Sequence, residues 1–465
     1  MNDCAKIGTY AQAEIDRKAD VVIDLARRIW ETPEIAYREF SACAWTAQLL
    51  EQEGFQVERN YAGLPTALRA SWGSGHPVIG FLGEYDALPG LSQKLSATQE
   101  AAVPGGPGHG CGHNLLCGAH VSAAIGVKKE LEQRGLEGTV VFYGCPGEEA
   151  ITGKAFMARG GAFRELDAAM AWHSSTNPRV IMGGTTAMDN VKFHFKGTTS
   201  HAGAAPHNGR SALDAVELMN VGANYLREHL TDDVRMHYII TDGGSAPNIV
   251  PGTASSWYYI RALSREAVLD TYRRLVKVAE GAAHMTETQV EVEYLGGCYN
   301  LLCSNTLAEI ALDVMLHDVS PSPWTDEDAA FAKQLNAVSP NYQKLLNAGA
   351  VTEDTQLNSS LGRISYEQDY SSTDVGDVSH IVPTICVTTT TLNIGATGHS
   401  WQVAACAGSN IGMLGMLRGG KVMAVTAMRL YTEPSLLEKA KKEFSSQMHN
   451  RTYQCPIPPE MPIPT

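Results

Sequence analysis

The chain has 465 residues, of which 44% are hydrophobic and 18% are charged. This composition is typical of a folded globular protein, and the length favours two or three structural units. Asp and Glu outnumber Lys and Arg by 50 to 36, which gives a formal charge of −14. Because an acidic surface repels phosphate backbones, we expect no nucleic-acid partner. We also expect no membrane span, since no run of about 18 apolar residues occurs.

The first 30 residues carry interspersed charged side chains and no apolar segment of the kind found in a secretory signal. The ten cysteines are scattered without paired spacing. Without an export signal, this pattern favours reduced thiols over a disulfide framework, and some of the thiols could be metal ligands. We therefore expect a cytoplasmic protein.

The first part of the chain predicts helices that alternate with strands. Helices are expected over 20–30, 42–53 and 115–134, and strands over 77–82, 139–143 and 168–172. Strands that alternate with helices favour an α/β fold, with a mostly parallel or mixed sheet flanked by helices.

The pattern changes near residue 190. Strands are expected over 191–195, 236–240, 255–262 and 289–294, with helices over 211–228 and 266–283. The order β-α-β-β-α-β is that of the ferredoxin-like α+β unit. We therefore predict an inserted domain over 188–300, with 1–187 and 301–465 forming the two parts of the first domain.

The chain after residue 300 is less regular. A strand is expected over 385–391, with final helices over 411–430 and 435–447. The stretch 321–366 is poorly patterned and predicts a long surface excursion, with helix expected only over 326–336. The proline-rich tail predicts irregular structure.

Polar residues follow the predicted strands at four places. These are Cys111 and His113 in a glycine-rich loop that opens a helix, the pair Glu148 and Glu149, then His173, and finally His399. Ligands of open α/β sheets bind outside the carboxyl ends of the strands, so one cleft could gather all six side chains.

These residue types suit metal chemistry. Thiolate and imidazole bind zinc, and carboxylate also suits manganese. A two-ion hydrolytic site needs about five protein ligands, and five are supplied by Cys111, His113, Glu149, His173 and His399. Glu148 remains as a candidate general acid/base. Each residue alone is also compatible with an ordinary structural role. Cys117 and His120, one helical turn apart, have ligand spacing too, but their apolar surroundings favour packing.

At these residues the sequence resembles the co-catalytic metallopeptidases that include carboxypeptidase G, aminoacylase, hippurate hydrolase and the auxin-conjugate amidohydrolases. The resemblance covers nearly the whole chain. The runs 83–88, 108–116, 142–149 and 372–379 resemble most the branch that hydrolyses p-aminobenzoyl-glutamate. In the auxin-conjugate and hippurate branch, Asp usually stands at the position of Asn114 and His at that of Leu116, so substrate preference does not carry over from that branch.

The resemblance implies a role for each residue. Cys111 would bridge two divalent ions, zinc or manganese. His113 and His173 would complete one ion, and Glu149 and His399 the other. The inserted domain would act as a lid and mediate dimer contact.

The resemblance also assigns residues of the inserted domain, which would lend groups to a partner's active site. His201 would stabilise an oxyanion, and His207 is a second candidate for that role. Asn248 and Arg261 would hold the substrate carboxylate, a task that suits a guanidinium. The alternative for Arg261 is an ordinary surface position on a strand.

We therefore expect a metal-dependent amidohydrolase of an N-acyl amino acid, foremost p-aminobenzoyl-glutamate, that forms a homodimer or a heterodimer with a homologous subunit. One alternative is the same mechanism on a hippurate-like or indole-acetyl amino acid or on a dipeptide. Another is a subunit that needs a partner chain for activity. A Cys111 nucleophile would leave Glu148, Glu149, His173 and His399 unexplained.

Overall fold

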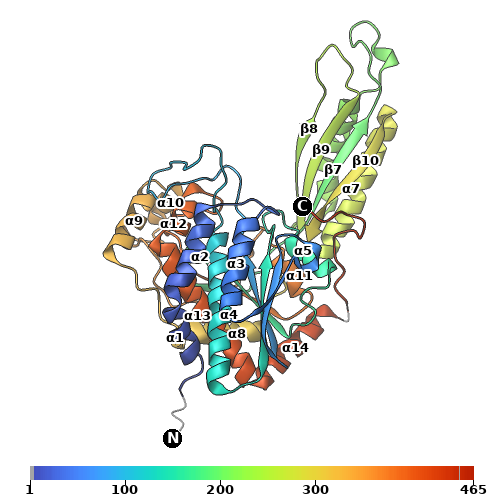
Figure 1. The fold of residues 1–465 in the computed structure, drawn as a ribbon. Helices are drawn as coiled ribbons and strands as arrows, with labels where there is room; N and C mark the ends of the chain where they lie inside the picture. Colours follow the sequence, from blue (N-terminus) through green and yellow to red (C-terminus); the bar gives the residue numbers. More distant parts are fainter. Residues whose placement is uncertain (1–4, 450, 465) are drawn as a thin grey trace.

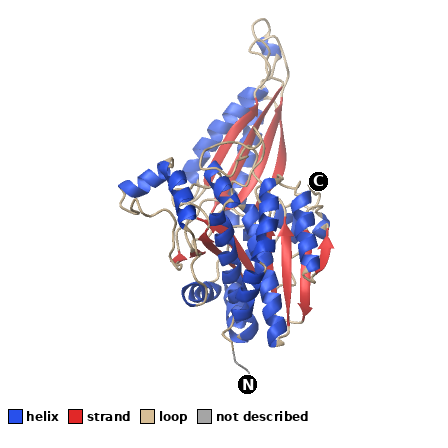
Figure 2. Cartoon of the chain, turned by 60° about the vertical axis from the view of Figure 1, so that its left-hand side comes forward, coloured by secondary structure: helices blue, strands red, loops and turns tan. Residues whose placement is uncertain are grey.

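The computed structural model describes residues 5–449 and 451–464. Its strands form two separate sheets, one of eight strands and one of four. The four-stranded sheet and its helices project from the body that holds the larger sheet (Figure 1). Figure 2 shows the strands of the two sheets as two distinct groups. Among the described residues, no helix is long and apolar enough to span a bilayer.

The larger sheet has the order β1-β2-β4-β3-β5-β12-β6-β11. The core pairs β3–β4, β3–β5 and β5–β12 are parallel, whereas β1–β2, β2–β4 and β12–β6 are antiparallel. The prediction of a mixed sheet is therefore confirmed. Its strands are β1 (Gln56–Arg59), β2 (Leu68–Ser74), β3 (Val78–Glu84), β4 (Gly138–Cys145), β5 (Ala168–Ser175), β6 (Arg179–Ile181), β11 (Ile364–Ser365) and β12 (Thr384–Thr390).

Apolar packing covers both faces of this sheet. On β3, Ile79 and Phe81 lie in one buried apolar cluster. Their neighbours Val78 and Leu82 lie in a second buried cluster. Because successive side chains of a strand point to opposite faces, the sheet is covered on both sides, which is why its central strands read as continuous apolar runs.

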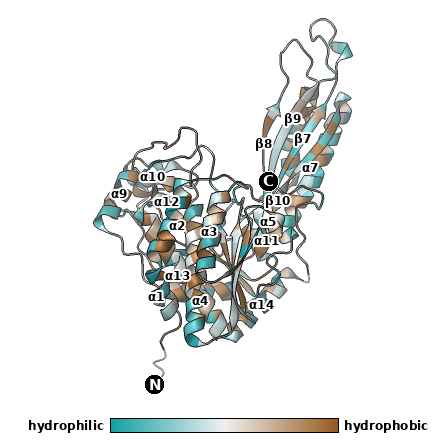
Figure 3. Ribbon diagram, viewed as in Figure 1, coloured by the Kyte–Doolittle hydropathy of each residue, from teal (hydrophilic) through white to brown (hydrophobic). Residues whose placement is uncertain are grey.

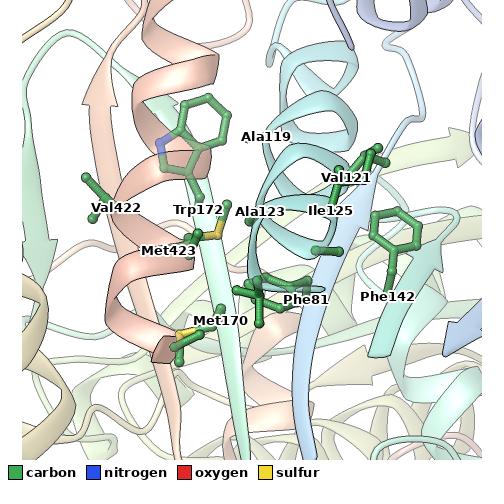
Figure 4. Packing of buried hydrophobic residues seen from close by; sticks show 14 of the residues in the cluster. Phe81, Ala119, Val121, Ala123, Ile125, Phe142, Met170, Trp172, Val422 and Met423 are labelled. Carbon is green, nitrogen blue, oxygen red and sulfur yellow. The ribbon is translucent and has the colours of Figure 1, made fainter. Parts of the chain in front are cut away.

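The body that holds this sheet also contains helices from before and after the smaller sheet in the sequence. They are α1 (Thr9–Arg17), α2 (Ala19–Glu31), α3 (Phe40–Gln52), α4 (His113–Arg134), α5 (Gly153–Arg159), α8 (Asn305–His317), α9 (Asp326–Ala337), α10 (Pro340–Asn347), α11 (Val375–Ser379), α12 (Trp401–Gly408), α13 (Asn410–Thr432) and α14 (Pro434–Met448). Helices α4 and α13 contact each other and β5, and Figure 4 shows Trp172 and Met170 of β5 beside Met423 of α13 and Ala123 of α4. Small residues of α4, among them Ala119 and Ala123, permit this close approach. Figure 3 shows that α4 becomes hydrophilic at its C-terminal end.

The smaller sheet is antiparallel, with the order β10-β7-β9-β8. Its elements are β7 (Ala187–Lys196), α6 (Ala212–Leu226), β8 (Arg235–Asp242), β9 (Thr253–Ala262), α7 (Arg265–Thr286) and β10 (Gln289–Cys298). The β-α-β-β-α-β order is therefore confirmed, and both helices share one apolar cluster with the sheet. The strands run from Ala187 to Cys298, while the domain boundaries at 188 and 300 stay a prediction.

Several elements differ from the sequence prediction. The first 60 residues hold three helices instead of two, because α1 precedes the expected pair. The stretch 321–366 holds α10 and the short strand β11 besides α9, and a capping box of Thr325 and Asp328 starts α9. Short 3-10 turns occupy η1 (Tyr61–Gly63), η2 (Pro206–Asn208) and η3 (Arg227–His229).

The C-terminal tail is irregular, as predicted, yet it is anchored. Arg159 of α5 donates to the carbonyls of Pro458 and Met461, and Ile457 is buried. Tyr299 donates to the carbonyl of Gln454 at 3.1 Å. The tail therefore packs across α5 and the segment that follows β10.

Candidate metal centre

The glycine-rich loop brings Cys111 and His113 to the start of α4. Gly112 between them has φ +81°, a left-handed conformation that favours glycine. A Cβ there would lie 2.8 Å from Ser174 Oγ of β5. The loop therefore lies against the end of β5, and Ser174 Oγ donates to the Cys111 carbonyl at 2.8 Å.

Three metal-ligating residues converge at this end of the sheet. The Cys111 sulfur lies 3.4 Å from His173 Nε2, and His113 belongs to the same group. Within each candidate group, the ligating atoms lie within 4.8 Å of one another. This is the spacing expected of donor atoms that surround one ion.

A second group shares Cys111 with the first. It consists of Cys111, Glu149 and His399. Nε2 of His399 lies 3.6 Å from Oε2 of Glu149, and Nε2 of His113 lies 3.8 Å from Oε1 of the same carboxylate. Two groups with one common thiol are the arrangement that a pair of bridged ions requires.

Glu148 and Glu149 lie on the loop between β4 and α5, which together with the first residue of α5 we call the carboxylate loop (146–153). Carboxylates from other elements hold its backbone. Glu39 accepts from the N–H of Gly147, and Asp86 accepts from the N–H of Glu149, both at 2.8 Å. The loop closes at Gly153, where a Cβ would lie 1.7 Å from the carbonyl oxygen of Pro146. Only glycine fits there.

Unsatisfied atoms at the centre fit a cation. His113 Nε2 and Glu149 Oε1 are buried without a hydrogen-bond partner among the described residues. Such atoms cost free energy unless something pairs with them. The thiol, imidazoles and carboxylates are the donors that divalent ions such as zinc and manganese take. The residues therefore fit a metal site.

Burial and like charges perturb these groups. Burial raises the pKa of Glu148 well above its usual value, and the neighbouring Glu84 carboxylate adds to the shift. Burial also raises the pKa of Glu149 to about 7 and that of Cys111 to about 12. A bound divalent cation would lower these pKa values, because it favours the anionic forms of the groups.

The placement of His173 corrects one sequence expectation. The strand was expected to end at residue 172, but β5 continues to Ser175, so His173 lies within the strand. Because β5 is buried on both faces, its sequence lacks the alternation that would mark where the strand ends. His399 lies where expected, in a loop before α12, and its side chain is 58% exposed.

The packing role favoured for Cys117 and His120 is confirmed. Both are buried in α4, and each ring nitrogen of His120 has a hydrogen-bond partner. Its Nε2 accepts from the N–H of Trp172 at 3.2 Å, and its Nδ1 lies 2.6 Å from the carbonyl oxygen of Leu116. The nine described cysteines are all free thiols.

Two carboxylates at the end of β3 belong to the centre but received no role from the sequence. Asp86 Oδ1 accepts from Nδ1 of His113 at 2.9 Å. Glu84 Oε2 lies 3.7 Å from Nε2 of His113. The signal was present, because both follow the apolar run 77–82 that was predicted as a strand.

The candidate substrate residues lie on the smaller sheet and its loops. His201 pairs with Ile249 in an isolated bridge, and Ala202 donates to the carbonyl of Asn248 at 3.0 Å. Nδ1 of His201 accepts from the N–H groups of Gly203 and Ala204, so a neutral ring carries its proton on Nε2 and can donate there. His207 is exposed in η2.

Arg261 lies on β9, where it reaches the larger body. It donates to Ser372 Oγ at 2.6 Å. Over the part of the chain that the structure describes, no carboxylate forms an ion pair with Arg261, and burial lowers its pKa. A half-buried guanidinium without an acidic partner suits an external carboxylate.

Comparison with known proteins decides the family. The M20 peptidase dimerisation domain model matches residues 184–286. One subunit of p-aminobenzoyl-glutamate hydrolase from Escherichia coli is 42% identical over 94% of each chain. The chain belongs to the M20 peptidase family. This result confirms the resemblance and identifies the chain as an amide-hydrolysing metalloenzyme.

Two further proteins are similar at lower identity. The Xaa-Arg dipeptidase of Mus musculus is 31% identical over 94% of this chain and 92% of its own. A Bacillus subtilis crystal structure, described as a dinuclear metal binding peptidase from the M20 family, has a TM-score of 0.60 at 18% identity. It covers 90% of this chain and 99% of that one. The likeness supports the predicted fold.

Proposed function

We propose that this M20 enzyme hydrolyses p-aminobenzoyl-glutamate to p-aminobenzoate and glutamate with two divalent ions. The single observation that carries the substrate is the similarity to the hydrolase subunit over nearly the whole chain. The shared thiol of Cys111 and the two overlapping donor groups support the pair of ions. The thiol favours zinc, whereas the imidazole and carboxylate ligands also suit manganese.

Five residues would hold the ions: Cys111, His113, Glu149, His173 and His399. Bound divalent ions polarise a carbonyl and make water more acidic, which is the chemistry that amide hydrolysis needs. Glu148 has no part in either of the two overlapping groups that share Cys111, and Oε2 of its carboxylate lies 3.8 Å from Nε2 of His113. The Glu148 carboxylate is therefore available for proton transfer.

Glu148 is the general acid/base of this proposal. It takes a proton from water as the water oxygen attacks the amide carbon, and it delivers the proton to the nitrogen as the C–N bond breaks. His201 donates from Nε2 to the oxyanion, with His207 as the second candidate. Arg261 and Asn248 hold a glutamate carboxylate.

Dimerisation through the smaller sheet belongs to the same proposal. The exposed face of α6 carries Leu218, Val221 and Tyr225 at helical spacing, and the edge strand β8 carries exposed Ile239 and Ile240. Exposed apolar side chains beside an open sheet edge favour association. The partner is a second copy or a homologous subunit, since the bacterial relative is named as one subunit of a hydrolase. A cytoplasmic location remains a prediction.

A dipeptide is the second candidate substrate. Similarity to the mammalian Xaa-Arg dipeptidase extends over most of the chain. Dipeptides and N-aroyl amino acids share an amide bond beside a free carboxylate, so the same centre could serve either. The residues that contact the acyl group decide between them.

The experiment is amine release by the purified protein alone, with zinc or manganese added. The panel holds p-aminobenzoyl-glutamate, hippurate, indole-acetyl-aspartate, N-acetyl amino acids and Xaa-Arg dipeptides. We expect turnover of p-aminobenzoyl-glutamate that a chelator abolishes and added metal restores. Turnover of another member alone would reassign the substrate. Inactivity of the metal-loaded protein on the whole panel would count against the proposal for the isolated chain.

Glu148→Gln tests the acid/base within that assay. The variant keeps the shape of the side chain, so metal content should match that of the wild type while kcat falls at least about 100-fold. Glu130→Gln is the control, because Glu130 is also buried but lies near the C-terminal end of α4, where it accepts from the N–H of Gly8. Near wild-type kcat in Glu148→Gln would remove this role.

A further inference from the structure

A fully enclosed lysine lies behind the candidate metal centre. Lys154, in the first turn of α5, has no solvent-exposed surface. Its Nζ donates to Oε1 of Glu84 at 2.5 Å and to Oδ1 of Asp374 at 2.6 Å. The Lys154 backbone N–H donates to Oδ2 of the same Asp374 at 2.7 Å. We call these three residues the buried triad.

The triad joins three elements that the sequence keeps far apart. Glu84 ends β3, Lys154 follows the carboxylate loop, and Asp374 precedes α11. Asp374 holds Lys154 by both its backbone and its side chain, which fixes the position and the direction of the residue where the loop ends. The carboxylate loop therefore has three anchors: Glu39 at Gly147, Asp86 at Glu149, and Asp374 at Lys154.

Stability alone is a poor explanation for this triad. Removing an ammonium and two carboxylates from water is costly, and apolar side chains of equal volume are often as stable. Burial lowers the pKa of Lys154, but the carboxylates of Asp374 and Glu84 outweigh it and raise the pKa well above its usual value. The side chain of Lys154 is thus held as an ammonium ion. It is linked to the centre by its hydrogen bond to Glu84.

We propose that Lys154 is a positioning residue that sets the place of Glu148 and Glu149 by locking the end of the carboxylate loop to Asp374 and Glu84. Glu84 links the triad to the centre, because its other oxygen, Oε2, lies 3.7 Å from Nε2 of His113, which is 3.8 Å from Oε2 of Glu148. Loosening the triad lets the loop shift, and small misplacement of a reacting group lowers the rate steeply. This inference rests on the proposed function for the roles of the two glutamates.

The first test is Lys154→Met, which keeps most of the unbranched side chain and removes its charged end. With p-aminobenzoyl-glutamate, we expect kcat per folded, metal-loaded chain to fall at least about 30-fold while KM changes less than about threefold. Glu130→Gln controls for the loss of a buried charge elsewhere and should keep wild-type kcat. A Lys154→Met kcat within about threefold of wild type would overturn the proposal.

Hydrogen exchange tests positioning without activity. In Lys154→Met, backbone amides of residues 147–156 should exchange at least about tenfold faster, while those of 122–134 in α4 keep their rates. Unchanged exchange over the loop would overturn the inference even if the wild type hydrolyses none of the panel. If the wild type is inactive but the loop of the variant exchanges faster, only the proposed function is contradicted.

Asp374→Asn provides a second variant where Lys154→Met gives no soluble protein. It keeps the volume of the side chain and weakens the hold on the ammonium, so we expect the same pattern at lower amplitude. A loss of kcat of about tenfold with unchanged metal content would support the triad. Wild-type kcat together with wild-type loop exchange would overturn it.

Discussion

Asp86 and His113 form a hydrogen bond of 2.9 Å, from Nδ1 of the imidazole to Oδ1 of the carboxylate. This bond fixes the proton on Nδ1 and turns the lone pair of Nε2 toward the candidate metal centre. The other oxygen of Asp86 accepts from the N–H of Glu149. One carboxylate therefore orients a predicted ligand from each of two separate segments.

Asp86→Asn should weaken metal binding. An amide can offer its oxygen to only one of the two donors at a time, so either the ring or the carboxylate loop loses its support. We expect metal affinity to fall about 10- to 100-fold, measured by competition with a chromophoric chelator. Asp16→Asn, on an exposed side chain of α1, is the control. Unchanged affinity would show that the ring keeps its orientation by packing alone.

The sequence indicated the candidate ligands, whose roles stay a prediction, but it did not indicate the contacts that support them. Cys111, Glu149 and His399 lie in loops and His113 begins α4, where glycines and the order of strands indicated a site. The bonds of Lys154 to Glu84 and Asp374 span 70 and 220 residues, and no local pattern predicts contacts at that separation. His173 was placed after its strand because a strand buried on both faces lacks the alternation that marks its end.

The smaller sheet was predictable from the alternation of apolar and polar residues along its strands. The smaller sheet has one covered face, so the alternation along residues 191–195 indicated a strand directly. Helix α8, which Ser304 caps, was not predicted from the sequence. Helix α1 buries Glu14 beside Ile15, and a buried charged residue interrupts the apolar stripe that identifies a helix.

His201 and Glu148 should complement each other across a dimer, if His201 serves the partner's centre. Glu148→Gln and His201→Ala are each expected to be inactive. Mixing them after subunit exchange makes half of the dimers hybrid, and each hybrid holds one intact centre, so about a quarter of wild-type activity should return. Mixing Glu148→Gln with Glu149→Ala is the control and should restore nothing. No recovery despite proven exchange would place His201 in its own subunit's reaction.

The exposed apolar face of α6 should form part of the dimer interface. The double substitution Val221→Asp and Tyr225→Asp introduces two charges into the apolar face, so we expect the sedimentation mass to fall to that of one chain. Tyr225 is 74% exposed, so the chain itself should remain folded. Val338→Asp, at an exposed apolar residue between α9 and α10, should leave the mass unchanged. A dimer that survives the double substitution would put the interface elsewhere.

Glu443 should stabilise the protein above a pH of about 4 and lose that effect in acid. Its carboxylate accepts from the N–H groups of Asn305 and Thr306 at the start of α8, at 2.8 and 3.0 Å. Burial alone would raise the pKa of Glu443, but these hydrogen bonds outweigh it and lower the pKa to about 2. The folded state thus binds the proton more weakly than the unfolded chain, and its advantage is complete above the unfolded pKa of about 4.

Glu443→Gln measures this contribution. At pH 7 the variant should be less stable than the wild type by about 1 kcal/mol in urea unfolding, because the carboxylate is only partly buried and solvent screens it. The difference should shrink as the pH falls from about 4 toward 2, where the wild-type carboxyl also becomes neutral. Glu438→Gln, at an exposed position on the same helix, should show no such dependence. A stability difference that stays constant down to pH 3 would mean that the shape of the side chain matters at this helix start and its charge does not.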